Sequence, residues 1–124
     1  KIAPELADHH KSLPNILLAN LTEDGKDISE ESARMFAEKI MSARTVVWNG
    51  TMGLFEEEPY RLGTTIIAEA MKNTPAFTIV GGGDTEAALT VLGWDHDMDF
   101  ISTGGGAMLD YLCDGDLVGI NALE

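Results

Sequence analysis

The chain has 124 residues, of which 44% are hydrophobic, so it is the size of one domain and has enough apolar side chains to bury a core. Its eight Lys and Arg against twenty-one Asp and Glu give a formal charge of −13, which repels nucleic-acid phosphates and anionic membranes. No apolar stretch approaches the roughly 18 residues that span a bilayer, and the N-terminus lacks the pattern of a signal peptide. We therefore expect a cytoplasmic protein that binds neither nucleic acid nor membrane.

The first 26 residues are irregular, because Pro4, Pro14 and Gly25 interrupt them, and we assign them no role. From residue 27 onward, apolar residues recur at helical spacing or in short β-branched runs, and Asp27 or Ser29 is expected to cap the first helix. The predicted elements follow in this order: a helix from residue 29, a strand over 45–48, a helix over 59–72, a strand over 76–80, a helix from Asp84 or Thr85, a strand over 99–102 and a helix over 107–113.

The spacing within these helices also predicts which side chains are buried. Leu62, Ile67 and Met71 are among the residues of the helix over 59–72 that we expect to face the core. Cys113 is the single cysteine, so it cannot form an internal disulfide. Its position in an apolar helical run predicts a partly buried thiol rather than an exposed reactive one.

Strands that alternate with helices predict an α/β fold, in which a parallel β-sheet is covered by helices in a Rossmann-like three-layer arrangement. In such sheets ligands bind outside the carboxyl ends of the strands. Three glycine-rich turns fall there, over residues 48–53, 81–85 and 102–107. We therefore expect the functional site at this end of the sheet.

The glycine triplets at 81–83 and 104–106 carry the chemical argument. Without Cβ atoms a ligand can approach the main chain, and the helix that follows offers unpaired N–H groups with a favourable dipole, which suits a phosphate. A single turn of this kind is a plain tight connection about as often as it is a phosphate-binding turn. Two such turns at matching points of consecutive β-α units favour a phosphate site. Neither the G-x-x-x-x-G-K-[ST] nor the G-x-G-x-x-G fingerprint is present.

Two acidic positions border these turns. Asp84 is placed to hold a Mg²⁺ ion that bridges nucleotide phosphates, and its alternative role is the N-cap of the following helix. Thr85 is a second candidate for that cap. Glu56 begins an acidic cluster with Glu57 and Glu58, whose alternative interpretation is a solvated helix start. Spacing alone does not distinguish Glu56 from its two neighbours.

Taken together, the three turns resemble the motifs of phosphoglycerate kinases. WNGTMGLFE at 48–56 resembles the family's WNGPMGVFE, and the runs FTIVGGGDT at 77–85 and ISTGGGA at 101–107 match family segments almost letter for letter. The resemblance covers about residues 27–123. It implies a partial C-terminal, nucleotide-binding domain over 27–124, preceded by the irregular segment 1–26.

The resemblance also implies roles for individual residues. Glu56 would bind the ribose hydroxyls of ADP or ATP, Asp84 would bind Mg²⁺, and the amides of Gly104, Gly105 and Gly106 would stabilise the phosphoryl group in transfer. Further contacts to the nucleotide are implied for Asn49, Gly50, Gly53, Gly82, Gly83, Asp84 and Thr85. The implied reaction is reversible phosphoryl transfer from 1,3-bisphosphoglycerate to ADP, a step of glycolysis.

Departures from the family limit what the chain is expected to do alone. Thr51 replaces a family proline, which puts the rigidity of that turn in question. The basic N-terminal domain, through which 3-phosphoglycerate would bind, has no counterpart here. We expect an enzyme portion that is inactive by itself, from a monomeric parent. The alternatives are a stand-alone nucleotide-binding or interaction domain, and a fragment that self-associates through an exposed sheet edge.

Overall fold

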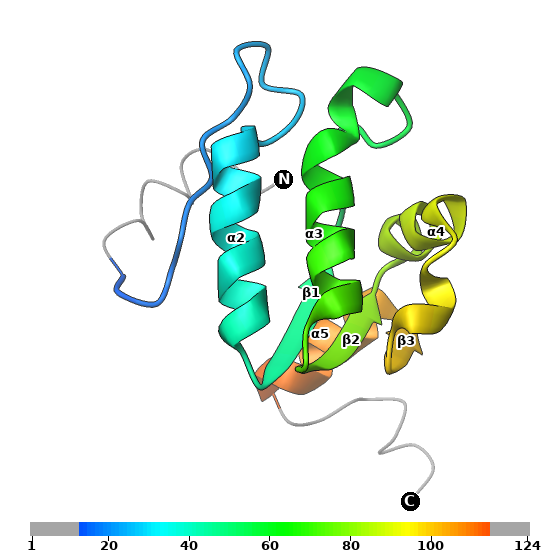
Figure 1. Ribbon diagram of the computed structural model, residues 1–124. Helices are drawn as coiled ribbons and strands as arrows, with labels where there is room; N and C mark the ends of the chain where they lie inside the picture. Colours follow the sequence, from blue (N-terminus) through cyan, green and yellow to red (C-terminus); the bar gives the residue numbers. More distant parts are fainter. Residues whose placement is uncertain (1–12, 115–124) are drawn as a thin grey trace, which may run out of the picture.

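The computed structural model describes residues 13–114, and its elements follow the predicted order (Figure 1). None of the helices within that range has the length and apolarity needed to cross a membrane. Two short 3-10 turns, η1 and η2, were not predicted. The elements are α2 (Glu30–Ser42), β1 (Thr45–Asn49), η1 (Glu58–Tyr60), α3 (Leu62–Asn73), β2 (Phe77–Gly81), α4 (Gly83–Leu92), η2 (Asp95–Asp97), β3 (Phe100–Ser102) and α5 (Gly105–Asp114).

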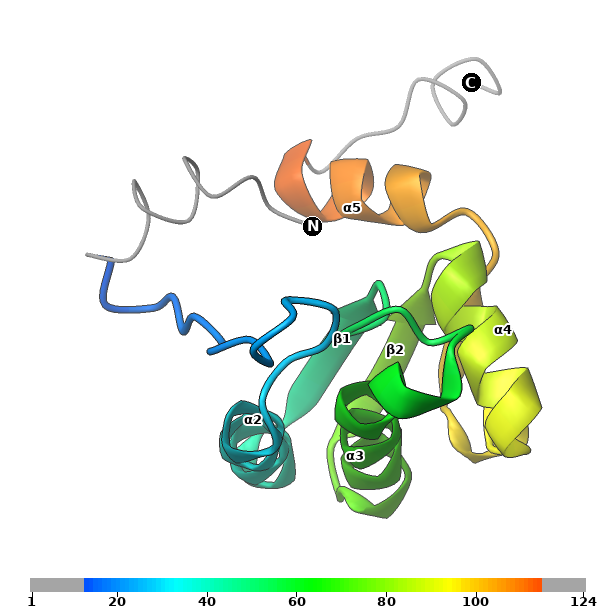
Figure 2. The same cartoon turned by 90° about the horizontal axis from the view of Figure 1, so that it is seen from above.

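The three strands form one parallel sheet in the order β1-β2-β3, which confirms the predicted α/β fold. Val47 pairs with Ile79, and Ile79 in turn pairs with Phe100. The carboxyl ends of the three strands, at Asn49, Gly81 and Ser102, therefore lie at the same end of the sheet. Figure 2 shows α2 and α3 on one side of the sheet and α5 on the other. The molecule therefore has three layers.

The core lies between the sheet and the helices α3 and α4. Alternate residues of a strand point to opposite faces, and the inward ones here are Trp48 and Val80, which are 4% and 0% exposed. They contact Ile67 and Met71 of α3 and Leu89 of α4. Ile67 and Met71 were predicted to be inward and are buried, but Leu62 is half-exposed. It is the first residue of α3, and the buried residues of that turn are Gly63 and Thr64.

Ser29 caps α2, which confirms one of the two predicted alternatives. Its side-chain oxygen accepts a hydrogen bond from the backbone N–H of Ser32 at 3.2 Å. Asp27 is not the cap, since its carboxylate is buried and accepts hydrogen bonds from the N–H groups of Ile28 and Gly63 at 2.8 and 2.9 Å. Asp27 therefore links the segment just before α2 to the first turn of α3.

The face of the sheet toward α5 is covered only in part by the described residues. Val47, Phe77 and Phe100 on this face are 39%, 52% and 54% exposed. Among residues 13–114 only α5 packs on this face, so no other described element covers its outer side, and Cys113 is exposed. The prediction of a partly buried thiol was wrong, since the apolar run around Cys113 is not enclosed by a second layer of described helices.

Candidate nucleotide-binding site

The three glycine-rich turns meet at the carboxyl ends of the strands, as predicted, and hydrogen bonds tie them together. The Asn49 side chain, at the end of β1, donates from Nδ2 to the carbonyl oxygen of Gly105 at 3.2 Å. The N–H of Gly50 donates to the hydroxyl of Thr85 at 2.7 Å. The first turn is thus joined to both others, and the polar groups of Asn49 and Thr85 serve this internal connection.

The glycines of the two triplets have different environments. A Cβ atom on Gly105 would lie 2.6 Å from Gly82 Cα, and one on Gly81 would lie 3.1 Å from the sulfur of Met108. Gly82 also has a φ of +93°, which disfavours other residues. By contrast, a Cβ on Gly83 or on Gly106 would meet nothing within 4 Å. Gly105 is therefore required by packing and Gly82 by its backbone conformation, whereas the flexible end of Met108 limits the space at Gly81, and Gly83 and Gly106 border open space.

Helices α4 and α5 begin side by side at these glycines. Gly82 is the N-cap of α4, no side chain caps that helix, and the Gly82 carbonyl accepts from the N–H of Glu86. In α5 the Gly104 carbonyl accepts from the N–H of Met108 at 2.9 Å. Two helix N-termini, each with a positive dipole end, thus converge beside the open glycines. Such an arrangement favours a bound anion.

Neither Asp84 nor Thr85 is the N-cap of α4, so both predicted alternatives for that cap were wrong. Gly82, with its positive φ, starts the helix earlier than the pattern indicated. Thr85 is fully buried and is occupied by its bond to Gly50. Asp84 is exposed in the first turn of α4, and its carboxylate forms no hydrogen bond or ion pair within residues 13–114.

The described residues contain no group of three or more His, Cys, Asp or Glu side chains that could hold a metal ion. A protein-only metal cage is therefore not found in this part of the chain. Mg²⁺ is commonly held by one or two carboxylates together with phosphate oxygens and water. The exposed Asp84 carboxylate, next to the open Gly83, fits that incomplete kind of site.

The acidic cluster separates into paired and unpaired members. Glu57 forms an ion pair with Lys26 at 3.6 Å, and Glu58 forms one with Arg61 at 3.1 Å. The Glu56 carboxylate is exposed and has neither a hydrogen bond nor an ion pair among residues 13–114. The structure thus distinguishes Glu56 from its neighbours, which spacing could not.

Asp27 anchors the loop between β1 and α3, a role that we did not predict. Cβ atoms on Gly53 and on Gly63 would each lie 2.5 Å from Asp27 Oδ1, so both glycines are needed for the loop to pack on this carboxylate. The N–H of Leu54 also donates to the carbonyl of Lys26 at 2.9 Å. The signal in the sequence was an acidic residue at the start of the matched region, which we interpreted only as a possible cap.

The turn that contains Thr51 is held by hydrogen bonds in place of a proline ring. The Thr51 hydroxyl donates to the Gly53 carbonyl at 3.1 Å, and the N–H of Met52 donates to the buried hydroxyl of Thr64 at 3.0 Å. Gly50, with a φ of +101°, makes the turn possible. Gly50 and Gly53 therefore shape the turn, and a Cβ on Gly50 would meet nothing within 4 Å.

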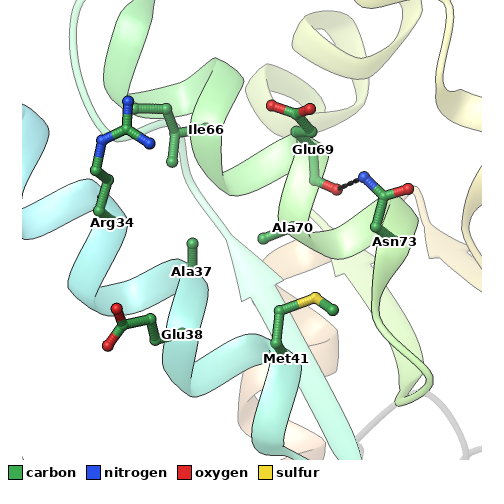
Figure 3. Close-up of a pocket in the computed structure, with 8 residues that line it drawn as sticks. All are labelled: Arg34, Ala37, Glu38, Met41, Ile66, Glu69, Ala70 and Asn73. Atoms are coloured by element: carbon green, nitrogen blue, oxygen red, sulfur yellow. Dashed lines mark hydrogen bonds between the residues drawn. The ribbon is translucent and has the colours of Figure 1, made fainter.

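A groove lies between α2 and α3, away from the glycine-rich turns. It is an open groove of about 580 Å³ (Figure 3). The small side chains of Ala37 and Ala70 form its floor, and Arg34, Glu38 and Glu69 stand around it. None of the predicted site residues lines this groove.

The fold and the convergent glycine turns define a class of protein, an α/β domain in which two helices begin at the carboxyl ends of parallel strands, and the comparisons identify the family. The sequence profile described as "Phosphoglycerate kinase" matches residues 5–115. The chain is 52% identical over 101 residues to the phosphoglycerate kinase of Pseudarthrobacter chlorophenolicus, covering 81% of this chain and 25% of that protein. The Streptomyces coelicolor phosphoglycerate kinase is 42% identical over 134 residues, covering 99% and 32%.

A solved structure agrees with the sequence comparisons. The phosphoglycerate kinase of Coxiella burnetii superposes with a TM-score of 0.72 at 40% identity, covering 79% of this chain and 25% of that one. The chain therefore belongs to the phosphoglycerate kinase family. It spans about a quarter to a third of the length of these relatives. The family match reaches back to residue 5, into the segment that we treated as irregular.

Proposed function

We propose that the chain is the nucleotide-binding portion of a phosphoglycerate kinase, an enzyme that transfers a phosphoryl group between 1,3-bisphosphoglycerate and ADP in glycolysis. One observation carries the proposal for this chain: α4 and α5 begin side by side, and each places a glycine, Gly83 or Gly106, next to open space. Unpaired N–H groups at two helix starts suit the phosphates of ADP or ATP.

The site residues take the following proposed roles. The exposed Glu56 carboxylate accepts hydrogen bonds from the ribose hydroxyls, and the amides of Gly82, Gly83, Asp84 and Thr85 face the nucleotide phosphates. Amides at Gly104, Gly105 and Gly106 stabilise the charge on the phosphoryl group in transfer, because preorganised donors lower the barrier of such reactions. Asn49, Gly50 and Gly53 hold the turn along the nucleotide.

Asp84 is the residue that would hold Mg²⁺. The ion would neutralise charge on the nucleotide phosphates when bound. A single exposed carboxylate fits this task, since the phosphates and water supply the other ligands. The main-chain amides and the Glu56 carboxylate would position the remainder of the nucleotide.

The chain does not supply the whole enzyme. We propose that 3-phosphoglycerate binds through a separate N-terminal domain, that residues 27–124 form the nucleotide-binding part, and that residues 1–26 form a distinct segment. The parent would be a monomeric protein of the cytoplasm with no nucleic-acid or membrane partner. Strands β1 and β3 are the edges of the described sheet, and self-association of the isolated chain would use one of them.

The alternative is a stand-alone nucleotide-binding domain derived from the kinase. It is favoured by the fact that both helix starts, Glu56 and Asp84 come from this chain alone. A coupled assay for ATP formation tests whether the chain is an incomplete enzyme, because a chain that lacks the sugar-phosphate domain should show no turnover. Magnesium-dependent turnover at a normal kinase rate of about 1–100 s⁻¹ would contradict the proposal of an incomplete enzyme.

The experiment that tests the site is ADP titration by calorimetry with Mg²⁺ and with EDTA. Asp84→Asn should keep the stability of the fold within about 1 kcal/mol, since Asp84 is exposed and contributes only a helix-dipole term. It should lose the effect of Mg²⁺ on ADP affinity, because a neutral amide is a poorer ligand for a hard cation. Unchanged magnesium dependence would remove Asp84 as the ligand.

A matched pair tests Glu56. Glu56→Ala should weaken ADP binding by about 1–3 kcal/mol, the usual loss for a charged hydrogen-bond partner. Glu58→Ala should have a much smaller effect, because the Glu58 carboxylate is paired with Arg61, and without it Arg61 keeps its bonds to the carbonyl oxygens of Phe55 and Glu56. Equal effects of the two substitutions would show that the cluster is a solvated acidic face and nothing more.

A further inference from the structure

Arg61 holds the segment that carries Glu56. It lies between η1 and α3, and its Nε donates to the carbonyl oxygen of Phe55 at 2.7 Å. Its Nη2 donates to the carbonyl oxygen of Glu56 at 3.2 Å. A single guanidinium thus bonds the main chain at two consecutive residues.

Two further contacts fix the guanidinium itself. It lies over the ring of Phe55, 5.2 Å from the ring centroid, and this ring is only 6% exposed. Nη1 donates to the carboxylate of Glu58 at 3.1 Å. All three guanidinium nitrogens of Arg61 and one face of the group therefore have partners.

These contacts bear on Glu56 in two ways. Bonds to two successive carbonyls restrict the rotation of the main chain on both sides of Glu56, and so limit the directions in which its side chain can point. The ion pair with Glu58 also occupies the neighbouring carboxylate. The rigid fork of arginine suits this arrangement, and the single ammonium of lysine does not reach two fixed acceptors as well.

We propose that Arg61 is a positioning residue for ribose recognition, which acts by holding the Glu56 carboxylate toward the two ribose hydroxyls. This inference rests on the proposed nucleotide function. It adds a residue outside the three glycine turns and assigns it a selective effect. Loss of Arg61 should affect the recognition of the ribose hydroxyls and leave phosphate recognition by α4 and α5 in place.

The test compares ADP with 2′,3′-dideoxy-ADP, which lacks both hydroxyls, by NMR titration of the full 124-residue chain with Mg²⁺. NMR suits weak binding, and the ratio of the two dissociation constants does not depend on the fraction of folded protein. The unsubstituted chain should prefer ADP by about tenfold or more, the value of a charged hydrogen bond. In Arg61→Ala this preference should fall to about twofold, and Arg61→Lys should lie between them.

Arg34→Ala is the matched control. Arg34 also bonds a glutamate, Glu30, through two guanidinium nitrogens, but on α2 and without any bond to the β1–α3 loop. Its removal should leave the preference for ADP unchanged. The double variant Arg61→Ala with Glu56→Ala should be no worse than Glu56→Ala alone, because the two residues act through one contact.

The outcomes separate this inference from the function on which it rests. An Arg61→Ala variant that keeps the full preference for ADP, or a double variant whose losses add, would overturn the inference. Binding of ADP without any preference over the dideoxy nucleotide in the unsubstituted chain would also overturn it, while the phosphate site would stand. No binding of either nucleotide would contradict the proposed function as well.

Discussion

Replacing Gly105 by alanine tests the contact between the two helix starts. A Cβ at Gly105 would lie 2.6 Å from Gly82 Cα and 2.9 Å from the side-chain nitrogen of Asn49. Ordinary contacts between such atoms begin at about 3.5 Å, so α5 would have to move by roughly 1 Å. Because Gly82 is main chain at the start of another helix, it cannot rotate away.

The size of the effect follows from these contacts. Overpacking of this kind costs about 1–3 kcal/mol, and the displaced Gly105 carbonyl would lose its hydrogen bond from Asn49, worth about 1 kcal/mol. Alanine regains up to about 1 kcal/mol over glycine in a helix. The expected net loss is about 1–3 kcal/mol, and about 4–8 °C in Tm for each kcal/mol in a domain of this size.

The assay is urea or thermal unfolding followed by far-UV circular dichroism, with Gly106→Ala as the control. A Cβ at Gly106 would meet nothing within 4 Å, so the control should be unchanged or more stable by about 0.5–1 kcal/mol. The two substitutions differ by one position in the same helix. Equal stability of the two variants would refute the reasoning that Gly105 is required by packing.

Three further predictions follow. Asp27→Ala should destabilise the fold by about 2–4 kcal/mol in urea unfolding, because it leaves the N–H groups of Ile28 and Gly63 without their charged acceptor, and Asp27→Asn should cost less; equal stability of Asp27→Ala and the parent would contradict the anchoring role. The backbone N–H and the hydroxyl of Thr78 lower the pKa of Asp99, so its contribution to stability is present above the pKa of an unfolded aspartate, about 4, and is lost as the pH falls through the lower folded value. The urea midpoint of Asp99→Ala should therefore fall less steeply below about pH 4 than that of the parent. If both midpoints fell equally steeply, the Asp99 carboxylate would not be a source of the acid sensitivity. Cys113 should react with a thiol reagent in the folded chain as fast as in urea, since it is exposed, and strong protection in the folded state would contradict its placement.

Most of the fold could be predicted because its elements are locally consistent. β-branched and aromatic residues at Val46, Val47 and Trp48 are typical of a strand, and the helix that follows Ser29 has both a cap and an apolar face. Glycine turns then punctuate each unit. The short turns η1 and η2 were not predicted, because three residues carry too little periodicity to distinguish them from the adjacent helix or loop.

The candidate site could be located from the sequence but not resolved into roles. The glycines of a triplet look alike in sequence, and only their surroundings distinguish the tightly packed Gly105 from the open Gly106. Thr85 looked like a cap, yet its hydroxyl is used by Gly50, which is 35 positions away. The anchoring role of Asp27 is equally non-local, since Gly63 lies 36 positions further along the chain.

The partly covered sheet makes the colloidal behaviour of the chain depend on its charge. Val47, Phe77 and Phe100 expose an apolar strip, which on its own would promote face-to-face association. At neutral pH the net charge of −13 keeps molecules apart. Near the isoelectric point of about 4.4 that repulsion vanishes while the strip stays exposed, and high salt screens it in the same way. The soluble range of the isolated chain therefore lies at pH values well above 4.4 and at low ionic strength.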